Sequence, residues 1–490
     1  MTISERFRPS LALLTDLYQL TMAQGYWQKG MAEQEAVFQV YFRKNPFGGG
    51  YTVAAGLADA IDLLQHLKFT PEDLAYLGSL RGSKNQPLFE PEFLAYLQQM
   101  QFTSTVSAVP EGTVVFPNEP LLRIQGPILQ CQLVETPLLT ILNFQTLVAT
   151  KAARITEAAQ GDRVIEFGMR RAQGPDGALS ATRAAFIGGV GATSNLLAGQ
   201  LFNIPVKGTH AHSWVMSFEE EQEAFAAYAE VFPDDAVFLV DTYHTLEGIK
   251  KAIAVAQDLR SRGHELQGIR LDSGDLAYLS KEGRRLLDEA GFPDISIVAS
   301  NDLDEYIIQN LKLQGARIDT WGIGTKLVTA YDQPALGGVY KLAALRNQNG
   351  EWEYKLKLSE QLAKISTPGI QQIRRFYNER GFLADMIYSE EKQASATLVD
   401  PNDATRRRTM PAHTAYQDLL VPVFHQGQCV YENPDLVAIQ RYARQQVQQL
   451  HESIRRFLNP HSYPVGLEED LFNQKMDLIL KLRQGKQETV

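Results

Sequence analysis

Short apolar runs that each end in polar residues recur through the middle of this 490-residue chain. Segments long enough for one helix apiece separate these runs, which are Arg163–Arg171, Ile204–Ser213, Ala236–His244, Gly268–Asp275, Ile295–Asp302 and Asp319–Lys326. The pattern predicts strands that alternate with helices, and such units build a parallel sheet or a barrel with its chemistry in the loops after the strands. We therefore expect the residues at the strand tips to converge on one cavity: Arg170, His212, Asp241, Asp272, Asn301 and Gly324.

The length of the chain predicts two or three domains, because a single core usually serves about 100–200 residues. The alternation of apolar and polar residues in segments such as Val339–Leu345 is typical of antiparallel strands. We predict an α+β domain over residues 1–133, an α/β barrel over 134–336, an antiparallel β-rich part over 337–432 and a helical segment over 433–490. For the middle part, a barrel or half-barrel is favoured over an open sheet.

Charge and cysteine content restrict the partners and the compartment. A net charge of −10 argues against a broad nucleic-acid or anionic-membrane surface, since either would need an excess of Lys and Arg. The two cysteines, Cys131 and Cys429, form neither a disulfide framework nor a metal-binding pair, which indicates a reducing cytoplasm. The most apolar stretch, Cys131–Ala149, is interrupted by polar residues and predicts a buried helix, not a membrane span.

Two histidines stand two residues apart in the segment Gly208–Ser213, and strand alternation would place His210 and His212 on one face. Three interpretations are open. The histidines could satisfy backbone groups in the core, or they could bind zinc together with His244 and Asp272, as in a barrel hydrolase. Alternatively, one histidine could accept a phosphoryl group while a carboxylate such as Asp241 holds its tautomer.

Other strand tips carry residues suited to a phosphorylated ligand. Arg270 and Asp272 share one strand face, where a guanidinium can bind phosphate and a carboxylate can hold a sugar hydroxyl or a divalent cation. The segments Trp321–Lys326 and Leu336–Lys341 bring glycines to strand boundaries, where backbone N–H groups can bind an anion. The aromatic Phe167 precedes paired guanidiniums at Arg170 and Arg171, which predicts a second anion-binding element.

Taken in order, a set of segments resembles the nicotinate phosphoribosyltransferase family over nearly the whole chain. The segments are Thr15–Met22, Glu166–Ala178, Gly208–Ser213, Leu239–Thr245, Arg270–Leu276, Ala299–Asp302, Gly322–Thr325, Leu336–Leu342 and Asn459–Leu467. The resemblance implies a type II phosphoribosyltransferase fold, in which an irregular α/β barrel is flanked by a domain built from both chain ends. It also implies synthesis of nicotinate mononucleotide and diphosphate from nicotinate and 5-phosphoribosyl 1-diphosphate, coupled to ATP hydrolysis with Mg²⁺. A cytoplasmic homodimer with shared active sites is expected.

The resemblance also implies a role for each matching residue. His212 would be phosphorylated by ATP and Asp241 would orient its imidazole, while Arg270 and Asp272 would hold the ribose and diphosphate. The pyridine ring would stack between Phe167 and Tyr18 of the partner subunit. The remaining substrate-binding residues would be Arg170, Arg171 and Asn301, with a 5′-phosphate cradle at Gly322, Gly324, Thr325, Gly337 and Gly338. Mg²⁺ would arrive with the diphosphate or ATP, without a permanent protein ligand.

Three alternatives remain at this stage. Nicotinamide phosphoribosyltransferases share the fold and the histidine, and we hypothesise that Arg171 selects the carboxylate of nicotinate over the amide. A metal-dependent barrel hydrolase would use His210, His212, His244 and Asp272. A binding protein without catalysis on the same fold is the third possibility.

Overall fold

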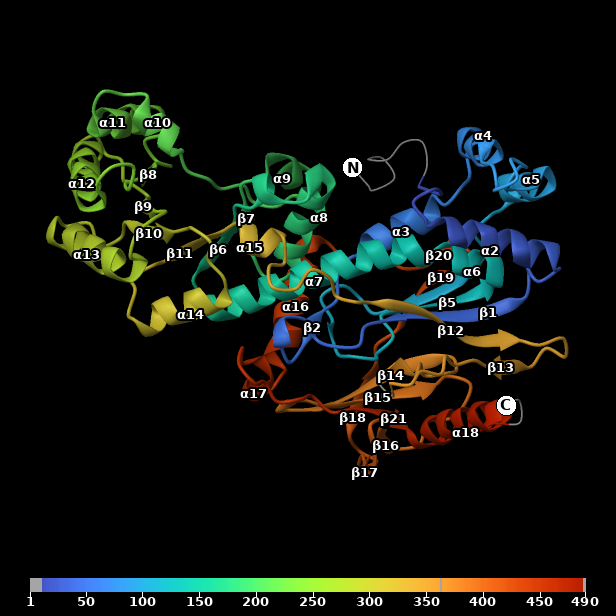
Figure 1. Cartoon of the computed structure of the whole chain (residues 1–490). Coiled ribbons are helices and arrows are strands. Elements are labelled where there is room, and N and C mark those ends of the chain that lie inside the picture. The colour runs from blue at the N-terminus through green and yellow to red at the C-terminus, as the bar shows by residue number, and fades with distance from the viewer. Residues whose placement is uncertain (1–10, 362–363, 488–490) are drawn as a thin grey trace. The chain divides into compact units, whose positions relative to one another are not determined.

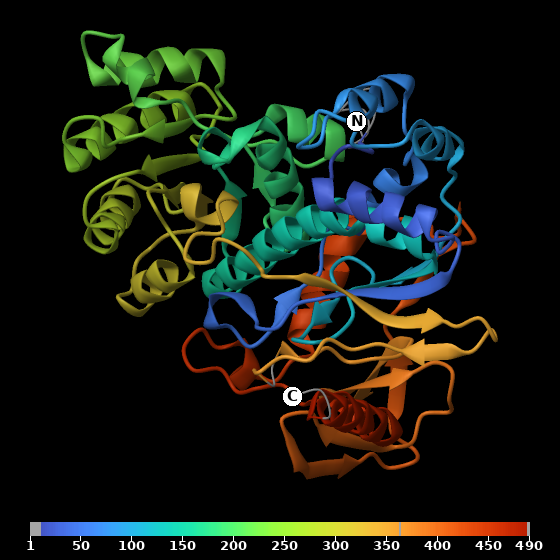
Figure 2. The same ribbon diagram turned by 45° about the vertical axis from the view of Figure 1, so that its right-hand side comes forward.

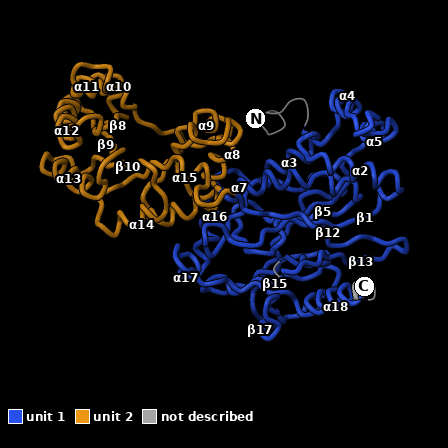
Figure 3. Tube along the Cα trace, in the orientation of Figure 1, with its two compact units in different colours: residues 1–147, 335–490 blue, residues 148–334 orange. Residues whose placement is uncertain are grey.

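A computed structural model describes residues 11–361 and 364–487 of the chain, with side chains to residue 484. The described chain divides into two compact units, which are shown in different colours in Figure 3. Unit 1 comprises residues 1–147 and 335–490, and unit 2 comprises residues 148–334. None of the described helices is both long and apolar enough to cross a membrane.

Unit 2 is built on a six-stranded parallel sheet with the strand order β7-β6-β11-β10-β9-β8. The first strand of the series, β6, is thus hydrogen-bonded to the last, β11, which is the neighbour relation of a ring. Among the described residues, the only joint of that ring without a strand pair is the one between β7 and β8. The strands are β6 (Arg163–Glu166), β7 (Ala192–Thr193), β8 (Val237–Leu239), β9 (Gly268–Leu271), β10 (Ser296–Ala299) and β11 (Thr320–Ile323). The sheet therefore has the strand order of an irregular barrel that is open at one joint.

The structure corrects the prediction of a strand at Ile204–Ser213. The segment makes an isolated parallel bridge from Val206 to Thr193 of β7 and then leaves the sheet, so that a short helix begins at His212. His210 further along contacts β8, because the backbone N–H of Leu239 donates to its Nε2 at 3.2 Å. Residues 206–210 therefore cross the open joint between the two edge strands. The edge strand β7, which sequence patterns did not indicate, supplies the missing sheet position.

Helices connect and cover the parallel strands, as Figures 1 and 2 show for α12, α13 and α14 beside β8–β11. Polar side chains begin these three helices: His244, Asp275 and Asp304 each accept a backbone N–H in the first turn. The strands themselves are mostly buried, as expected for parallel strands covered on both faces. The helices of unit 2 after α7 (Glu135–Ala159) are α8 (Gly174–Ile187), α9 (Leu196–Phe202), α10 (His212–Met216), α11 (Glu221–Val231), α12 (Thr245–Ser261), α13 (Leu276–Glu289), α14 (Glu305–Leu313) and α15 (Thr325–Val328).

Unit 1 contains two larger sheets in which nearly all pairs are antiparallel. One has the order β13-β12-β1-β5-β3-β19-β20 and the other the order β17-β16-β21-β15-β14-β18. Both chain ends build the first sheet, since β12 pairs with β1 and β19 pairs with β3. Its strands are β1 (Glu35–Tyr41), β3 (Thr105–Ala108), β5 (Leu122–Pro127), β12 (Val339–Arg346), β13 (Trp352–Tyr354), β19 (Val421–His425) and β20 (Gln428–Cys429). The second sheet has β14 (Gln371–Asn378), β15 (Gly381–Ser389), β16 (Thr397–Asp400), β17 (Asp403–Thr409), β18 (Ala415–Asp418) and β21 (Val465–Glu468).

Helices near both ends of the chain complete unit 1. One apolar cluster packs helices α2, α4, α5 and α6 through side chains such as Leu20, Phe93 and Leu133. The helices are α2 (Leu17–Gln28), α3 (Leu57–Gln65), α4 (Pro71–Ser79), α5 (Pro91–Gln99), α6 (Ile128–Leu133), α16 (Leu436–Gln448), α17 (Glu452–Arg455) and α18 (Glu469–Gln487). The predicted apolar helix at Cys131–Ala149 is divided between α6 and α7 (Glu135–Ala159), and α7 continues into the sequence of unit 2.

Candidate functional site

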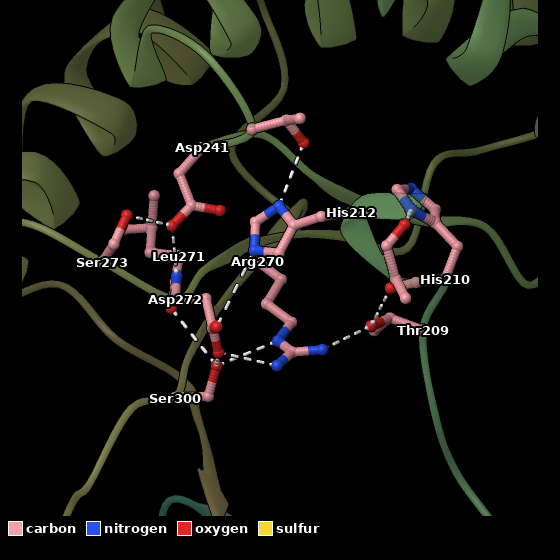
Figure 4. Close-up of polar contacts among 11 residues, drawn as sticks. Thr209, His210, His212, Asp241, Arg270, Leu271, Asp272, Ser273 and Ser300 are labelled. Atoms are coloured by element: carbon pink, nitrogen blue, oxygen red, sulfur yellow. Dashed lines mark hydrogen bonds and ion pairs between the residues drawn. The ribbon is translucent and has the colours of Figure 1, made fainter. Parts of the chain in front are cut away.

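The centre of the candidate site is Arg270, at the carboxyl end of β9 (Figure 4). Its guanidinium donates to Ser300 Oγ at 2.9 Å, to Asp272 Oδ1 at 2.7 Å and to Thr209 Oγ1 at 3.0 Å. The Ser300 hydroxyl also donates to Asp272. One guanidinium therefore joins three segments that are distant in sequence, and the convergence predicted for the tips of β9 and β10 is present.

Asp272 is held as an anion by these contacts. Partial burial alone would raise the pKa of its carboxyl group, but the Ser300 hydrogen bond and the Arg270 guanidinium outweigh burial and hold the pKa below its ordinary value. The side chain of Asp272 is 30% exposed, so one carboxylate edge remains open to a ligand. A fixed carboxylate beside a fixed guanidinium can bind a sugar hydroxyl and a phosphate together.

His212 lies at the rim of this cluster, at the start of α10. Its Nδ1 is 3.1 Å from Thr242 Oγ1, and its Nε2 is 3.8 Å from Asp272 Oδ2. If Nδ1 carries the proton and donates to Thr242, Nε2 has a free lone pair that faces the carboxylate. The side chain is 42% exposed, so a ligand can reach this nitrogen.

Asp241 supports the cluster through Asp272, and no hydrogen bond joins it to His212 among the described residues. Its Oδ2 accepts the backbone N–H of Asp272 at 2.8 Å and the hydroxyl of Ser273 at 2.6 Å. The other carboxylate oxygen is buried and has no hydrogen-bond partner in the described part of the chain. The direct contact expected between Asp241 and the imidazole is thus absent here, and Thr242 and Asp272 are the groups that face His212.

Of the three interpretations of the histidine pair, His210 fits the first, a core histidine that satisfies a backbone group. It is buried against Phe225, Tyr228 and Phe238, and burial lowers its pKa to about 4. Its Nε2 is already occupied by the Leu239 N–H. Because the segment is not a regular strand, the two imidazoles do not share a face as alternation would predict. No group of three or more His, Cys, Asp or Glu within residues 11–361 and 364–487 has the geometry of a metal site.

Phe167 follows β6 and packs where a side chain on Gly322 would collide with it. A Cβ at Gly322 would lie 2.7 Å from two carbons of the ring, so only glycine leaves the ring in its place. The Arg270 guanidinium lies 5.4 Å from the ring centroid. Phe167 also lines a cavity of about 910 Å³, whose other walls come largely from the amino-terminal starts of the strands, such as Arg163, Ser296 and Thr320. The aromatic wall and the guanidinium cluster are therefore adjacent.

Sequence reasoning missed several residues that build this site. Glu166 is fully buried and accepts from Thr193 Oγ1 at 2.6 Å, from Thr182 Oγ1 at 3.0 Å and from the Gly168 N–H, which fixes the turn that carries Phe167. Ser300, Thr209 and Thr242 were also missed. The available signal was their position, because each directly neighbours a predicted tip residue or histidine.

The remaining predicted site residues of unit 2 have fewer contacts than the Arg270 cluster. Arg170 and Arg171 form a short 3-10 turn and are exposed, and no hydrogen bond or ion pair of either guanidinium occurs within the described chain. Asn301 is exposed and has φ 96°, a left-handed conformation that is costly for a non-glycine residue and recurs at functional loops. Gly324 and Thr325 stand at the start of the short helix α15.

Tyr18, Gly337 and Gly338 belong to unit 1. Tyr18 is 48% exposed at the start of α2, and burial followed by the charge of Glu135 raises the pKa of its hydroxyl group. The N–H of Gly338 donates to Asn143 Oδ1 at 2.9 Å, so it is already occupied, whereas Gly337 has φ 74° and open space around its Cα. A phosphate cradle at Gly338 would require release of the Asn143 contact.

The chain matches sequence models of nicotinate phosphoribosyltransferase over most of its length. The N-terminal domain of that enzyme matches residues 13–143, the nicotinate phosphoribosyltransferase (NAPRTase) family matches residues 163–367, and the C-terminal domain matches residues 370–475.

Full-length relatives agree with these matches. The nicotinate phosphoribosyltransferase of Bacillus subtilis (strain 168) is 45% identical over 485 residues, which cover 97% of this chain and 96% of the relative. That of Dictyostelium discoideum is 39% identical and covers 96% and 88%. The crystal structure of human nicotinic acid phosphoribosyltransferase matches with a TM-score of 0.83 and 33% identity, covering 95% of this chain and all of the human chain. The chain therefore belongs to the nicotinate phosphoribosyltransferase family and has its mixed α/β fold.

Proposed function

We propose that this chain joins nicotinate to 5-phosphoribosyl 1-diphosphate, giving nicotinate mononucleotide and diphosphate. The observation that carries the proposal is the meeting of Arg270, Asp272 and His212 at the carboxyl ends of parallel strands, next to Phe167. Full-length similarity to enzymes of this name supports the choice of substrates.

The bond exchange at the ribose needs charge stabilisation more than a base. The pyridine nitrogen attacks the anomeric carbon, a C–N bond forms, and the C–O bond to diphosphate breaks with both electrons going to the leaving group. Arg270, fixed by three hydrogen bonds, lies ready to stabilise the negative charge that develops on diphosphate. Mg²⁺ bound to the diphosphate would neutralise further charge, and the open edge of Asp272 is the oxygen donor suited to it.

ATP coupling would use His212. In this proposal Nε2 attacks the γ-phosphorus, the P–N bond forms, and the bond to ADP breaks. The phosphoryl group would add a charge of about −1.5 to −2 close to Asp272, by analogy with other phosphorylated side chains. Repulsion between the two anions would then change how Asp272 and Arg270 hold the diphosphate, and hydrolysis of the phosphohistidine would restore the starting arrangement.

Nicotinate itself would stack on Phe167, and Tyr18 of the partner subunit would cover the other face of the ring. The exposure of Tyr18 supports a role toward another molecule. Arg170 and Arg171 are exposed cations next to Phe167 in the chain, and we assign the substrate carboxylate or phosphates to them. Gly322, Gly324 and Thr325 keep their proposed role at the 5′-phosphate, and Asn301 keeps its proposed role in substrate binding. A homodimer and a cytoplasmic location remain parts of this proposal.

The central test incubates the protein with ATP, Mg²⁺ and phosphoribosyl diphosphate, and compares nicotinate, nicotinamide and quinolinate as acceptors. We expect a mononucleotide from nicotinate alone. Product from nicotinamide without product from nicotinate would overturn the proposal in favour of nicotinamide phosphoribosyltransferase. Absence of diphosphate release with all three bases would favour the non-catalytic binding protein.

Two substitutions test the individual roles. His212→Ala should abolish acid-labile phosphate incorporation from ATP and the ATP stimulation of synthesis, and normal incorporation would show that another residue is the acceptor. Arg171→Ala should weaken the preference for nicotinate over nicotinamide, because it removes a cation from beside the ring, and an unchanged preference would exclude Arg171 as the selecting group.

A further inference from the structure

Unit 1 contains a second large cavity, of about 1090 Å³, that shares no residue with the candidate site. Its walls come from the β16–β17 hairpin, from the loop before β21 and from α18. We call it the basic cavity and define it by five cationic side chains in its lining, which are Arg406, Arg407, Arg408, Arg456 and Lys475.

The charge balance of the basic cavity is opposite to that of the chain. Among its described lining residues, the one carboxylate is Asp400. The chain as a whole carries a net charge of −10, so a group of five cations around one cavity is a local reversal. Like charges gathered in this way repel one another, and the repulsion is relieved when an anion binds among them.

Acidic neighbours outside the cavity neutralise only part of the group. Arg406 pairs with Asp403 at 3.2 Å, and Arg407 pairs with Glu469. Each of the other three donates to a neutral oxygen: Arg408 to the Leu383 carbonyl at 3.2 Å, Arg456 to the Asn459 carbonyl at 2.8 Å and Lys475 to Thr367 Oγ1 at 3.0 Å. In the described part of the chain, none of these three cations has an ion-pair partner.

Protection of a sheet edge does not account for this arrangement. The strand β17 is the edge strand of its sheet, and charged residues on an edge discourage pairing with another chain. That function explains arginines on β17, but Arg456 follows α17 and Lys475 lies on α18. Lys475 is also largely buried, and burial lowers its pKa to about 8. Because burial disfavours the charged form of this amine, a bound anion would offset that cost.

We propose that the basic cavity binds an organic compound with two or more phosphate groups, at a site separate from the catalytic cluster of unit 2. Arg408, Arg456 and Lys475 would hold the phosphates, since guanidiniums bind phosphate oxygens in pairs. The cavity volume and apolar lining residues such as Ile365, Ile387 and Leu398 leave room for an uncharged part. This proposal does not depend on the reaction proposed for unit 2.

The test follows the reactivity of Lys475 itself. At pH 8 an amine with a lowered pKa is partly neutral and reacts with acetic anhydride faster than ordinary lysines, and peptide mass spectrometry reports its labelling separately. Saturating inorganic triphosphate or ADP should reduce the labelling rate of Lys475 roughly tenfold, in proportion to the unoccupied fraction. Lysines outside the cavity should be unaffected.

Variants distinguish binding in the basic cavity from binding at the catalytic cluster. Because Arg408 and Arg456 are exposed, the double variant Arg408→Gln/Arg456→Gln should fold normally and lose the protection of Lys475. Arg444→Gln, a matched exposed arginine on α16 outside the cavity, should keep it, and so should Arg270→Gln, which disables the catalytic cluster. The proposal is overturned if neither compound protects Lys475, if the double variant keeps full protection, or if Arg270→Gln abolishes it.

Discussion

Replacing Gly322 by alanine tests whether the position of Phe167 governs nicotinate binding. The new Cβ would lie 2.7 Å from two carbons of the ring, whereas ordinary contact begins near 3.4 Å, so the ring or the strand must move by about 0.7 Å. The new methyl group would also lie 3.3 Å from the Cβ of Ser300. Because Phe167 lines a cavity, the ring can swing away without unfolding the protein.

The expected effect is therefore on binding more than on stability. Overpacking of this kind costs about 1–3 kcal/mol, which corresponds to a roughly 5- to 150-fold increase in the KM for nicotinate if the cost falls on the stacked complex. Steady-state kinetics with varied nicotinate and saturating phosphoribosyl diphosphate measures it, and thermal unfolding checks that the variant is folded.

Gly191→Ala is the matched control, because its Cβ would meet only the Val164 carbonyl at 3.7 Å, an ordinary contact in the same sheet. We expect it to leave the KM for nicotinate unchanged. A folded Gly322→Ala variant with the KM of the parent would refute the assignment of Phe167 as the wall that carries the base.

Three further predictions concern other contacts. Ser300→Ala removes a hydrogen bond to the charged Asp272 and one from Arg270; it should lower kcat/KM for phosphoribosyl diphosphate at a cost of about 1.5–3 kcal/mol and move the acid limb of the pH profile to higher pH, both visible in steady-state kinetics. Burial disfavours protonation of His210 in the folded state, so its contribution to the free energy of unfolding should be fully present above pH about 6.5 and fall by about 3 kcal/mol toward pH 4. Chemical unfolding of the parent and of His210→Gln at pH 7 and pH 5 measures this, and the variant should show the smaller difference between the two pH values. Asp385→Asn leaves the buried Arg375 without its bidentate partner and should cost about 3–5 kcal/mol in urea unfolding, with little change in activity per folded molecule.

The parallel strands could be predicted because burial on both faces leaves a mostly continuous apolar run, as in β8 and β10. The helix start at Asp275 could also be predicted, since a side-chain cap is a local feature. The strand β7 could not, because two residues are too few to establish a period. The Asn143 contact that occupies the Gly338 N–H joins residues 195 positions apart, and no local pattern encodes such a pair.

The difference between local patterns and contacts of distant residues also explains why His210 and His212 do not share one face. Alternation predicts one shared face only while the backbone is in a sheet, and here the chain leaves the sheet after Val206. Residues 208–211 donate no backbone hydrogen bond to another backbone group among the described residues. Side chains hold the segment instead: Thr209 accepts from Arg270, and His210 accepts from Leu239 of β8.

The side-chain contacts that hold residues 208–211 also connect His212 to the Arg270 cluster. A segment held by sheet hydrogen bonds would resist displacement along its whole length, whereas this segment is held by side-chain contacts and by the packing of His210 against Phe225, Tyr228 and Phe238. One of these contacts is made by Arg270, which also holds Asp272, the carboxylate closest to Nε2 of His212. A phosphoryl group placed on His212 would therefore act on the same guanidinium from two sides, through Asp272 and through Thr209. The open joint between β7 and β8 thus places His212, the proposed phosphoryl acceptor, directly after a segment that has no regular sheet pairing.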